Sequence, residues 1–504
     1  MKSRILSSLL LAAVLSCVLL SAGCGGGTAS PAETTAAAQT QAADTTAADT
    51  AEVTEEDVTL KNGVPAGMDL NGEEIRVLYT SHNRYVTDII GDQDGDIINE
   101  AVYARNLEVE EWLNIHFAPV TYGSNSTTES TNTLEKTVLA GEDLFDICSL
   151  HQSYSLKLVL NGYYHNFADD PYITYESPWW LKDYILEFGV GNDNIFFLEG
   201  DISLMMLKSM GGVFFNKGLY ESLIGSCDDL YAEVLDGGWV FDTFAENVKK
   251  GWADLNGNST VDVDEDRFGA AVITAKTVEH FQYDAGITST TKDADGIPRL
   301  TLNNERTVRF AEKLYALYYE NEGTYTSTQD LLDNTYLDMF KQDRLLFDPS
   351  WLYTAELLRD MESDYGILPY PKLDEQQDRY LNLVHNGTTV FCTPITCTKT
   401  DHIGAVLEAM CCTAYDTMTP AYFEVALKNK YSRDNASSQV LDLIRAGIYT
   451  NFGYCYSSNI NGLGMLRDLM NKKTADFSSW YASKADAAQT GLDALITAYT
   501  EAFN

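Results

Sequence analysis

Short runs with strand character alternate with helical stretches in the first folded part of the sequence. The strand runs lie at 74–80, 115–120 and 144–150; one helical stretch between them begins after Asp96, and the other ends at Gly141. Aspartate commonly caps a helix N-terminus, and glycine commonly closes a helix C-terminus. The alternation predicts a parallel sheet with crossover helices, and therefore an α/β fold.

Polar residues follow the first and third predicted strands. They are Ser81, His82, Asn83 and Arg84 after the first, and His151, Gln152 and Ser153 after the third. Ligands of parallel sheets bind beyond the carboxyl ends of the strands. We therefore expect a ligand to contact this part of the chain, and we predict that His82 and Arg84 are ligand-binding residues.

The length and charge of the chain limit its organisation and its partners. A chain of 504 residues is too long for one small core, which favours two lobes or two domains. It carries 74 acidic and 34 basic residues, a formal net charge of -40. Such acidity argues against nucleic acid, anionic lipid and a polyanionic ligand. Neutral and cationic ligands remain open.

The N-terminus has the features of a secreted protein. A short basic start precedes an uncharged apolar run that is too short to span a membrane. The end of that run, Leu-Ser-Ala-Gly-Cys at 20–24, resembles the lipobox of bacterial lipoproteins. The resemblance implies cleavage before Cys24 and lipidation of its thiol. We expect a signal peptide at 1–23 and a flexible, low-complexity tether at 24–67; an ordinary signal peptide with an accidental cysteine is the alternative.

Of the 9 cysteines, Cys17 leaves with the signal peptide and Cys24 would carry the lipid, which leaves an odd number in the mature domain. These cannot all pair with one another, and their spacing matches no zinc knuckle. Cys392 and Cys397 either form a disulfide or are small buried thiols.

An acidic loop at 254–265 has the spacing of a calcium-binding EF-hand loop, which supplies ligands from positions 1, 3, 5, 7, 9 and 12. The corresponding residues are Asp254, Asn256, Asn258, Thr260 through its carbonyl, Asp262 and Glu265. Ser259 stands where glycine eases the sharp turn, so it must adopt a backbone that glycine adopts more readily. Because a strand follows, we expect a structural calcium clip rather than a paired sensor; a solvated acidic turn is the alternative.

The sequence contains none of the motifs GxSxG, HExxH, GxxxxGK[ST] or, after a strand, GxGxxG. A carboxylate pair for glycoside hydrolysis needs no fixed spacing and is not excluded. Four aromatic residues in turn or loop contexts fit sugar binding, because apolar sugar faces stack on aromatic rings: Trp179, Trp180, Trp351 and Tyr353. Two adjacent tryptophans do not easily face one core, so at least one of the pair should be exposed or in a cleft. Ordinary packing is the alternative for each.

Four stretches, in this order, resemble the extracellular solute-binding proteins of bacterial ABC importers (family 1, carbohydrate type). They are a crossing strand that ends in Asn-Lys at 210–217, a helix entry at 230–244, a DLNGDG-type insertion at 254–269 and a return strand at 364–371. The resemblance covers nearly all of the mature chain.

The resemblance implies a two-lobed, periplasmic-binding-protein-like α/β fold of type II. The ligand would lie between the lobes, which are joined by crossing strands and close by a hinge motion. Lobe 1 would comprise 68–208 with about 366–428, and lobe 2 would comprise 209–365 with about 429–504. Members of this family bind their ligands through residues in loops. The resemblance therefore adds Asp201, which lies near the crossing strand, as a candidate ligand-binding residue, and it supports Trp351 and Tyr353.

The implied function is capture of a carbohydrate, in particular an oligosaccharide, by a lipid-anchored, extracytoplasmic monomer that delivers it to ABC permease subunits. The chain would not be an enzyme, and calcium would be its one cofactor. The alternatives are a surface glycoside hydrolase or lyase, a non-transport sensor or adhesin with the same lobes, and a peptide or polyamine ligand.

Overall fold

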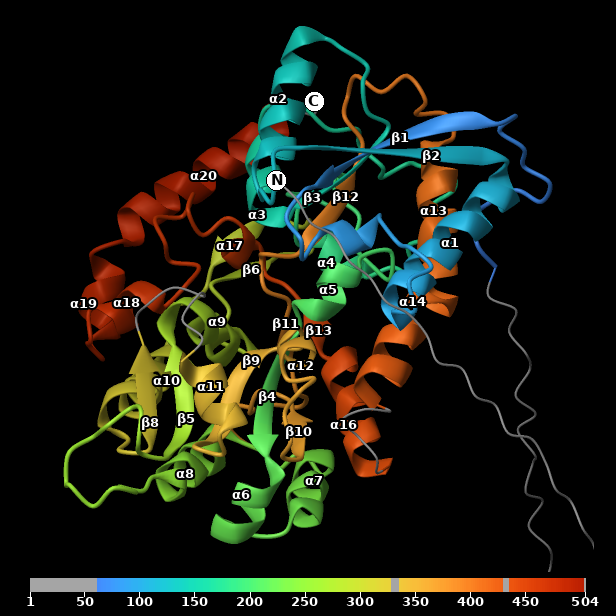
Figure 1. Cartoon of the computed structure of the whole chain (residues 1–504). Helices are drawn as coiled ribbons and strands as arrows, with labels where there is room; N and C mark the ends of the chain where they lie inside the picture. The colour runs from blue at the N-terminus through green and yellow to red at the C-terminus, as the bar shows by residue number, and fades with distance from the viewer. Residues whose placement is uncertain (1–60, 328–334, 429–434, 503–504) are drawn as a thin grey trace, which may run out of the picture. The chain divides into compact units, whose positions relative to one another are not determined.

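The computed structural model describes residues 61–327, 335–428 and 435–502, which form two lobes on separate sheets (Figure 1). The predicted signal peptide, Cys24 and the tether up to residue 60 lie outside the described residues. Residues 61–67 were also expected in the tether, but Val64 is buried and the Gly63 N–H donates to the Glu408 carboxylate at 3.2 Å. The packed chain therefore begins before Met68.

Lobe 1 is built on a four-stranded sheet with the order β12-β3-β1-β2. Strands β1 (Glu73–Thr80), β2 (Ile115–Tyr122) and β3 (Ile147–His151) are parallel, whereas β12 (Thr389–Cys392) runs antiparallel to β3. The parallel sheet predicted from residues 74–150 is confirmed.

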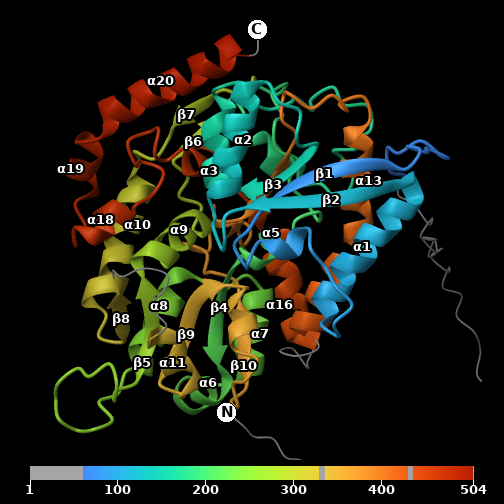
Figure 2. The same ribbon diagram turned by 45° about the horizontal axis from the view of Figure 1, so that its top comes forward.

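Helices α1 (Ile97–Leu113) and α2 (Glu129–Ala140) cover opposite faces of this sheet (Figure 2). The Asp96 carboxylate caps α1 by accepting from the N–H groups of Ile98 and Asn99, and Gly141 closes α2 with a φ of 69°. Both helix ends lie where the sequence predicted them. Helix α13 (Ile403–Asp416) packs on α1, and α3 (Gln152–Val159) directly follows β3.

Lobe 2 is built on a five-stranded sheet with the order β10-β4-β9-β5-β8. Strands β5 (Phe268–Ile273), β8 (Thr324–Ser327) and β9 (Leu345–Trp351) are parallel; β4 (Gly211–Asn216) runs antiparallel to both β9 and β10 (Tyr365–Leu368). The helices of lobe 2 are α6 (Lys217–Leu223), α7 (Cys227–Leu235), α8 (Phe241–Gly251), α9 (Thr274–Asp284), α10 (Glu305–Tyr315), which continues as the π-helical η2 (Ala316–Glu320), and α11 (Thr335–Lys341).

Helix α8 approaches β5 so closely that only glycine fits at residue 269. A Cβ there would lie 1.7 Å from the carbonyl oxygen of Val248. This contact fixes α8 on the face of the lobe 2 sheet.

Three chain segments meet where the lobes join. The first crossing runs from α5 (Leu204–Lys208) into β4, and Met210 bridges Val384 on the return segment. The return segment forms β11 (Asn382–Leu383), which pairs in parallel with β13 (Ile448–Tyr449). The Asn382 side chain accepts from the Gly211 N–H at 2.9 Å and donates to the Gly211 carbonyl at 2.7 Å. The Asn382 side-chain amide thus bonds the return segment to the first crossing, beside the Met210–Val384 bridge.

The lobe boundaries differ from the expected ones after residue 365. Strand β10 pairs with β4, so the return to lobe 1 begins after β10 rather than at residue 366. Helix α16 (Asn435–Ala446) packs on α7 and β10 of lobe 2 as expected. Helix α20 (Ala485–Ala502), however, brings the Tyr499 hydroxyl to the carbonyl of Phe188, which belongs to the part of the chain assigned to lobe 1.

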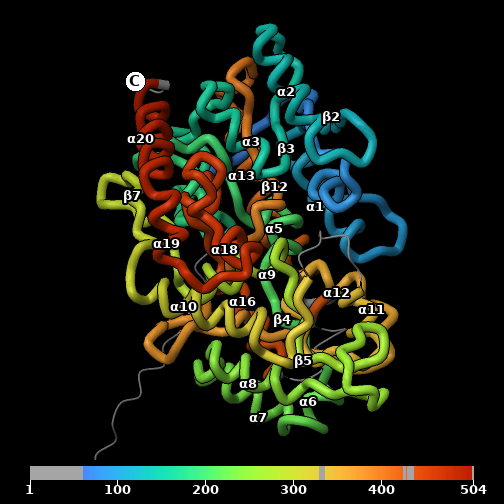
Figure 3. Tube along the Cα trace, turned by 90° about the vertical axis from the view of Figure 1, so that its left-hand side faces the viewer, coloured from blue at the N-terminus to red at the C-terminus, as the bar shows by residue number. Residues whose placement is uncertain are grey.

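The last helices, α18 (Arg467–Asn471), α19 (Phe477–Ala482) and α20, run in succession along one side (Figure 3). The remaining short elements are η1 (Val86–Asp88), α4 (Lys182–Leu186), β6 (Thr290–Lys292), β7 (Pro298–Leu300), α12 (Thr354–Leu357), α14 (Met418–Pro420), η3 (Ala421–Lys428) and α17 (Phe452–Cys455). Within the residues given above, no helix has the length and apolar composition needed to span a membrane.

Candidate functional site

Strand ends from both lobes lead into one group of side chains, because the carboxyl ends of parallel strands share an edge of each sheet. Strands β1 and β3 of lobe 1, β5, β9 and β10 of lobe 2, and the return segment all contribute. We call this group the interlobe cluster; its members are His82, Arg84, His151, Lys276, His280, Trp351, Tyr353, Tyr370 and His385.

Aromatic rings form the centre of the interlobe cluster. The Trp351 and His385 rings are 4.4 Å apart between centroids, and His385 lies 6.5 Å from His280 with nearly parallel planes. His280 in turn stacks on Tyr370 at 5.0 Å. This largely buried row of rings packs β9, the return segment and α9 against one another.

Cationic side chains from both lobes lie on aromatic rings of the cluster. The Arg84 guanidinium of lobe 1 sits 4.8 Å from the centroid of the Tyr353 ring of lobe 2. The Lys276 ammonium lies 5.7 Å from the Trp351 ring and donates to the Tyr336 hydroxyl at 3.0 Å. Such cation–π contacts are worth about 0.5–2 kcal/mol each, and the first one connects the lobes directly.

Several buried polar atoms of the cluster lack a hydrogen-bond partner among the described residues. They are Trp351 Nε1, His151 Nδ1, both ring nitrogens of His280 and the Tyr370 hydroxyl, together with Asp348 Oδ2 at the base of the cluster. Asp284 Oδ2 lies 3.5 Å from His280 Nδ1, which is long for a hydrogen bond. An unpaired buried polar group costs about 1–3 kcal/mol. A group of them in one place is therefore suited to a ligand that supplies donors and acceptors.

The imidazoles of the cluster are neutral at pH 7. Burial lowers the pKa of His151 to about 4 and that of His280 to about 3. Burial also lowers the pKa of His385 far below its ordinary value, helped by nearby positive groups that include Arg84. A neutral imidazole has one donor and one acceptor nitrogen, which matches a hydroxyl group. Burial raises the pKa of Asp348 to about 6, so this carboxyl is mostly ionised at pH 7.

Four of the predicted ligand residues, His82, Arg84, Trp351 and Tyr353, belong to the interlobe cluster. Trp351 was expected in a turn, but it is the last residue of β9 and only 7% exposed. His82 reaches the cluster through Tyr85, whose ring lies 5.5 Å from His82 and 5.4 Å from His151.

Trp179 and Trp180 lie in the core of lobe 1. They are 3% and 4% exposed, and both indole N–H groups donate to the carboxylate of Glu408 on α13. The expectation that at least one is exposed or in a cleft is wrong, because one buried carboxylate satisfies both rings. These tryptophans form part of the fold rather than of the interlobe cluster.

Asp201 is also separate from the interlobe cluster. Its buried carboxylate accepts from Thr419 at 2.6 Å and pairs with Arg445 of α16 at 3.1 Å. Both Asp201 and Arg445 line a cavity of about 420 Å³, and no member of the cluster lines it. Burial raises the pKa of Asp201 to about 6, against the opposing effect of Arg445.

Sequence reasoning missed Lys276, His280, Tyr370 and His385. Lys276 follows β5, the strand expected after the acidic loop, so the strand-end rule applied to lobe 2 would have found it. His280 lies one helical turn further along the same face of α9. His385 lies in an irregular segment and had no sequence signal.

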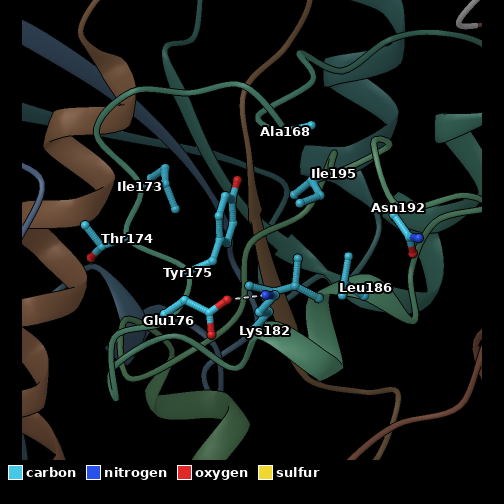
Figure 4. Close-up of a pocket in the computed structure, with 10 residues that line it drawn as sticks. Ala168, Ile173, Thr174, Tyr175, Glu176, Lys182, Leu186, Asn192 and Ile195 are labelled. Carbon is cyan, nitrogen blue, oxygen red and sulfur yellow. Dashed lines mark hydrogen bonds and ion pairs between the residues drawn. The ribbon is translucent and has the colours of Figure 1, made fainter. Parts of the chain in front are cut away.

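A second cavity, of about 600 Å³, lies within lobe 1 (Figure 4). Ile173, Ile185 and Ile195 line it together with Tyr175, and the ion pair between Lys182 and Glu176 lies at its polar side. Its lining contains none of the predicted ligand residues.

The acidic loop at 254–265 folds around its own side chains. The Asp254 carboxylate accepts from the N–H groups of Gly257 and Ser259 at 2.7 and 2.8 Å, and Asn256 donates to Glu265 at 2.7 Å. Ser259 has a φ of 59°, so the expected glycine-like backbone is confirmed. Over the described ranges, no three His, Cys, Asp or Glu side chains are grouped to hold a metal ion. Calcium binding by this loop stays a prediction.

The cysteines are free thiols in the described part of the chain. Cys392 faces Cys148 across the β12–β3 pair rather than Cys397. For Cys392 and Cys397 the structure thus shows the buried-thiol alternative, not a disulfide.

No protein-family model matches this sequence, and no curated protein does. The fold nevertheless has many solved counterparts. UspC from M. tuberculosis has a TM-score of 0.54 at 11% sequence identity, covering 83% of this chain and 100% of that one. The ABC substrate-binding protein Lmo0181 from Listeria monocytogenes, solved with cycloalternan, has a TM-score of 0.51 at 12% identity, covering 86% and 100%. The chain has the type II fold of two-lobed solute-binding proteins.

A further counterpart is the ABC transporter associated binding protein from B. animalis subsp. lactis Bl-04, solved with beta-1,6-galactobiose. Its TM-score is 0.51 at 12% identity, with coverage of 86% of this chain and 98% of that one. At such identities the likeness establishes the fold alone. In a solute-binding-protein fold, the interlobe cluster occupies the place where the strand ends of both lobes meet.

Proposed function

We propose that this chain is an extracytoplasmic solute-binding protein that captures a carbohydrate, in particular an oligosaccharide, for an ABC importer. The observation that carries the proposal is the set of buried, unpartnered polar atoms beside the aromatic row of the interlobe cluster. Sugars present hydroxyl groups around their edges and apolar faces above and below, so they match both features.

The solved counterparts support the same proposal. Two of the counterparts reported above were solved in complex with a carbohydrate, Lmo0181 with cycloalternan and the B. animalis protein with beta-1,6-galactobiose. We propose further that lipidation of Cys24 anchors the protein as a monomer outside the cell membrane, and that permease subunits of the importer receive the ligand. Replacing Cys24 by serine should then release the protein into the medium.

We propose binding without chemistry. A surface glycoside hydrolase or lyase would degrade the bound glycan, whereas a binding protein returns it intact. A sensor or adhesin with the same lobes would bind the glycan but would not need the permease for uptake. A peptide or polyamine ligand would keep the transport role and replace the sugar.

The test uses the mature chain with Cys24→Ser, screened by thermal shift against oligosaccharides, peptides and polyamines. A ligand at 100 times its Kd adds about 2.7 kcal/mol of stability. The best ligand is then measured by calorimetry against Trp351→Phe, which keeps an aromatic ring and removes the unpartnered Nε1. We expect Kd to rise about fivefold to tenfold, because one hydrogen bond is lost.

The matched control is Trp252→Phe. Trp252 packs against Phe268 with the ring centroids 5.0 Å apart and is not part of the interlobe cluster, so Kd should not change. Equal effects of both substitutions, or ligand binding unaffected by Trp351→Phe, would contradict the proposed site. Degraded glycan after incubation would support the enzyme instead.

A further inference from the structure

Two cations of the interlobe cluster, Arg84 and Lys276, have no anionic partner in the described part of the chain. Among the described residues, no Asp or Glu oxygen lies within 4.0 Å of the Arg84 guanidinium or the Lys276 ammonium, although other basic residues nearby are paired. Lys276 is only 3% exposed, and its one hydrogen bond to a described residue goes to the Tyr336 hydroxyl. A buried ammonium with spare donors is costly unless another group neutralises it.

The two cations reach one short segment from opposite lobes. Arg84 lies over Tyr353, and Lys276 lies over Trp351, two residues earlier in the chain. His385, which packs on Trp351, is close enough to Arg84 for the positive charge to help lower its pKa. An anionic group bound over this segment would therefore be held from both lobes.

The start of α9 adds to the positive field at Lys276. The N-cap residue of this 11-residue helix, Ile273, offers no side-chain hydrogen bond, so its first N–H groups have no side-chain cap. Helix N-termini favour anions. Independently, the indole of Trp351, which lies under the Lys276 ammonium, is 93% buried and its Nε1–H has no hydrogen-bond partner among the described residues.

Two other basic residues around the cluster are paired with carboxylates. Lys208 pairs with Glu356 at 3.0 Å, and Arg467 pairs with Glu279 at 2.5 Å. Burial raises the pKa of Asp348, and the nearby positive charge of Lys276 opposes this rise. Asp348 Oδ2 nevertheless has no hydrogen-bond partner among the described residues. The cluster thus keeps Arg84 and Lys276 as cationic donors for an anion, and Asp348 as a carboxylate acceptor for hydroxyl groups.

We propose that the captured sugar is acidic, with a single carboxylate bound between Arg84 and Lys276 over the segment from Trp351 to Tyr353. This inference rests on the proposed function and specifies its ligand. The net charge of -40 argues against a polyanionic ligand, and the proposed ligand carries a single negative charge. The few cationic groups of the cluster are enough to bind one carboxylate.

The experiment compares three oligosaccharides of equal length with the mature Cys24→Ser protein: one with a terminal uronic acid, its neutral methyl ester, and a sulfate ester. Calorimetry at low salt should show the uronate binding about tenfold or more tightly than the methyl ester. Lys276→Met and Arg84→Gln should each lower uronate affinity about tenfold and leave methyl-ester affinity within about twofold. Arg84 is half-buried, so its substitution tests the proposal even where Lys276→Met does not fold.

Lys249→Met is the matched control, since Lys249 is 66% exposed and lies on α8, outside the cluster. Equal affinity for the uronate and its methyl ester would overturn the acidic ligand and keep the proposed function, provided that Trp351→Phe weakens both. Preference for the sulfate ester would overturn the carboxylate. Failure of every carbohydrate to bind would overturn the proposed function and this inference together.

Discussion

Replacing Asn382 by alanine should loosen the junction of the lobes. Asn382 is 1% exposed, and its side chain satisfies both polar backbone groups of Gly211. Strand β9 does not bond these two groups of Gly211, because the neighbouring hydrogen bond between β4 and β9 runs from the Leu352 N–H to the Met210 carbonyl. Asn382→Ala would leave one donor and one acceptor buried and unpaired, at about 1–3 kcal/mol each. We expect a loss of about 2–5 kcal/mol in the free energy of unfolding.

Two measurements check this value. Urea unfolding gives the change in stability. Hydrogen exchange followed by mass spectrometry reports on the Gly211 N–H, whose hydrogen-bond acceptor among the described residues is Asn382 Oδ1. The control is Asn192→Ala, because Asn192 is exposed and makes one long bond of 3.3 Å to the Ala294 carbonyl; it should change stability by less than about 0.5 kcal/mol. An Asn382→Ala protein that matches this control and still protects the Gly211 amide would refute the reasoning.

Three further predictions concern other parts of the chain. Glu408→Gln should cost about 3 kcal/mol or more and shift tryptophan fluorescence to the red, because the carboxylate accepts from both indoles, from Thr174 and from Gly63; unchanged emission would contradict this. Between pH 7 and pH 5, the wild type should lose about tenfold in ligand affinity relative to His151→Gln. Burial lowers the pKa of His151 to about 4, so if lobe opening exposes this imidazole, it binds a proton below about pH 6.5 that ligand binding must release. The opposite effect of Asp348 is common to both proteins, and parallel profiles would refute the assignment. Excess calcium should raise the melting temperature, and Asp254→Ala should abolish the rise; a melting curve that neither calcium nor chelator changes would end the calcium prediction.

Much of the fold could be predicted from local patterns. Asp96 and Gly141 mark helix ends through their own side-chain and backbone preferences, and the strand runs of lobe 1 carry their periodicity in a few neighbouring residues. Strand β10 was harder to assign, because its lobe depends on pairing with β4, about 150 residues earlier in the chain.

The functional site was predictable only where a local rule applied. His82 and Arg84 follow a strand that the sequence reveals, and the strand-end rule selects them. The error at Trp179 and Trp180 has a long-range cause, since the burial of both rings depends on Glu408, which lies 229 and 228 residues away. His280 and His385 likewise become neighbours only through the return crossing.

The burial of the cysteines has a practical consequence. Cys227, Cys397 and Cys412 are buried, and burial raises the pKa of each thiol to about 11 or 12. Such thiols react slowly, because the thiolate is the reactive form. A cysteine placed on the surface of each lobe, for example by Asn83→Cys and Asp360→Cys, would therefore be labelled selectively by maleimide dyes. Energy transfer between the two dyes would then report the opening and closing of single molecules without removal of these buried cysteines.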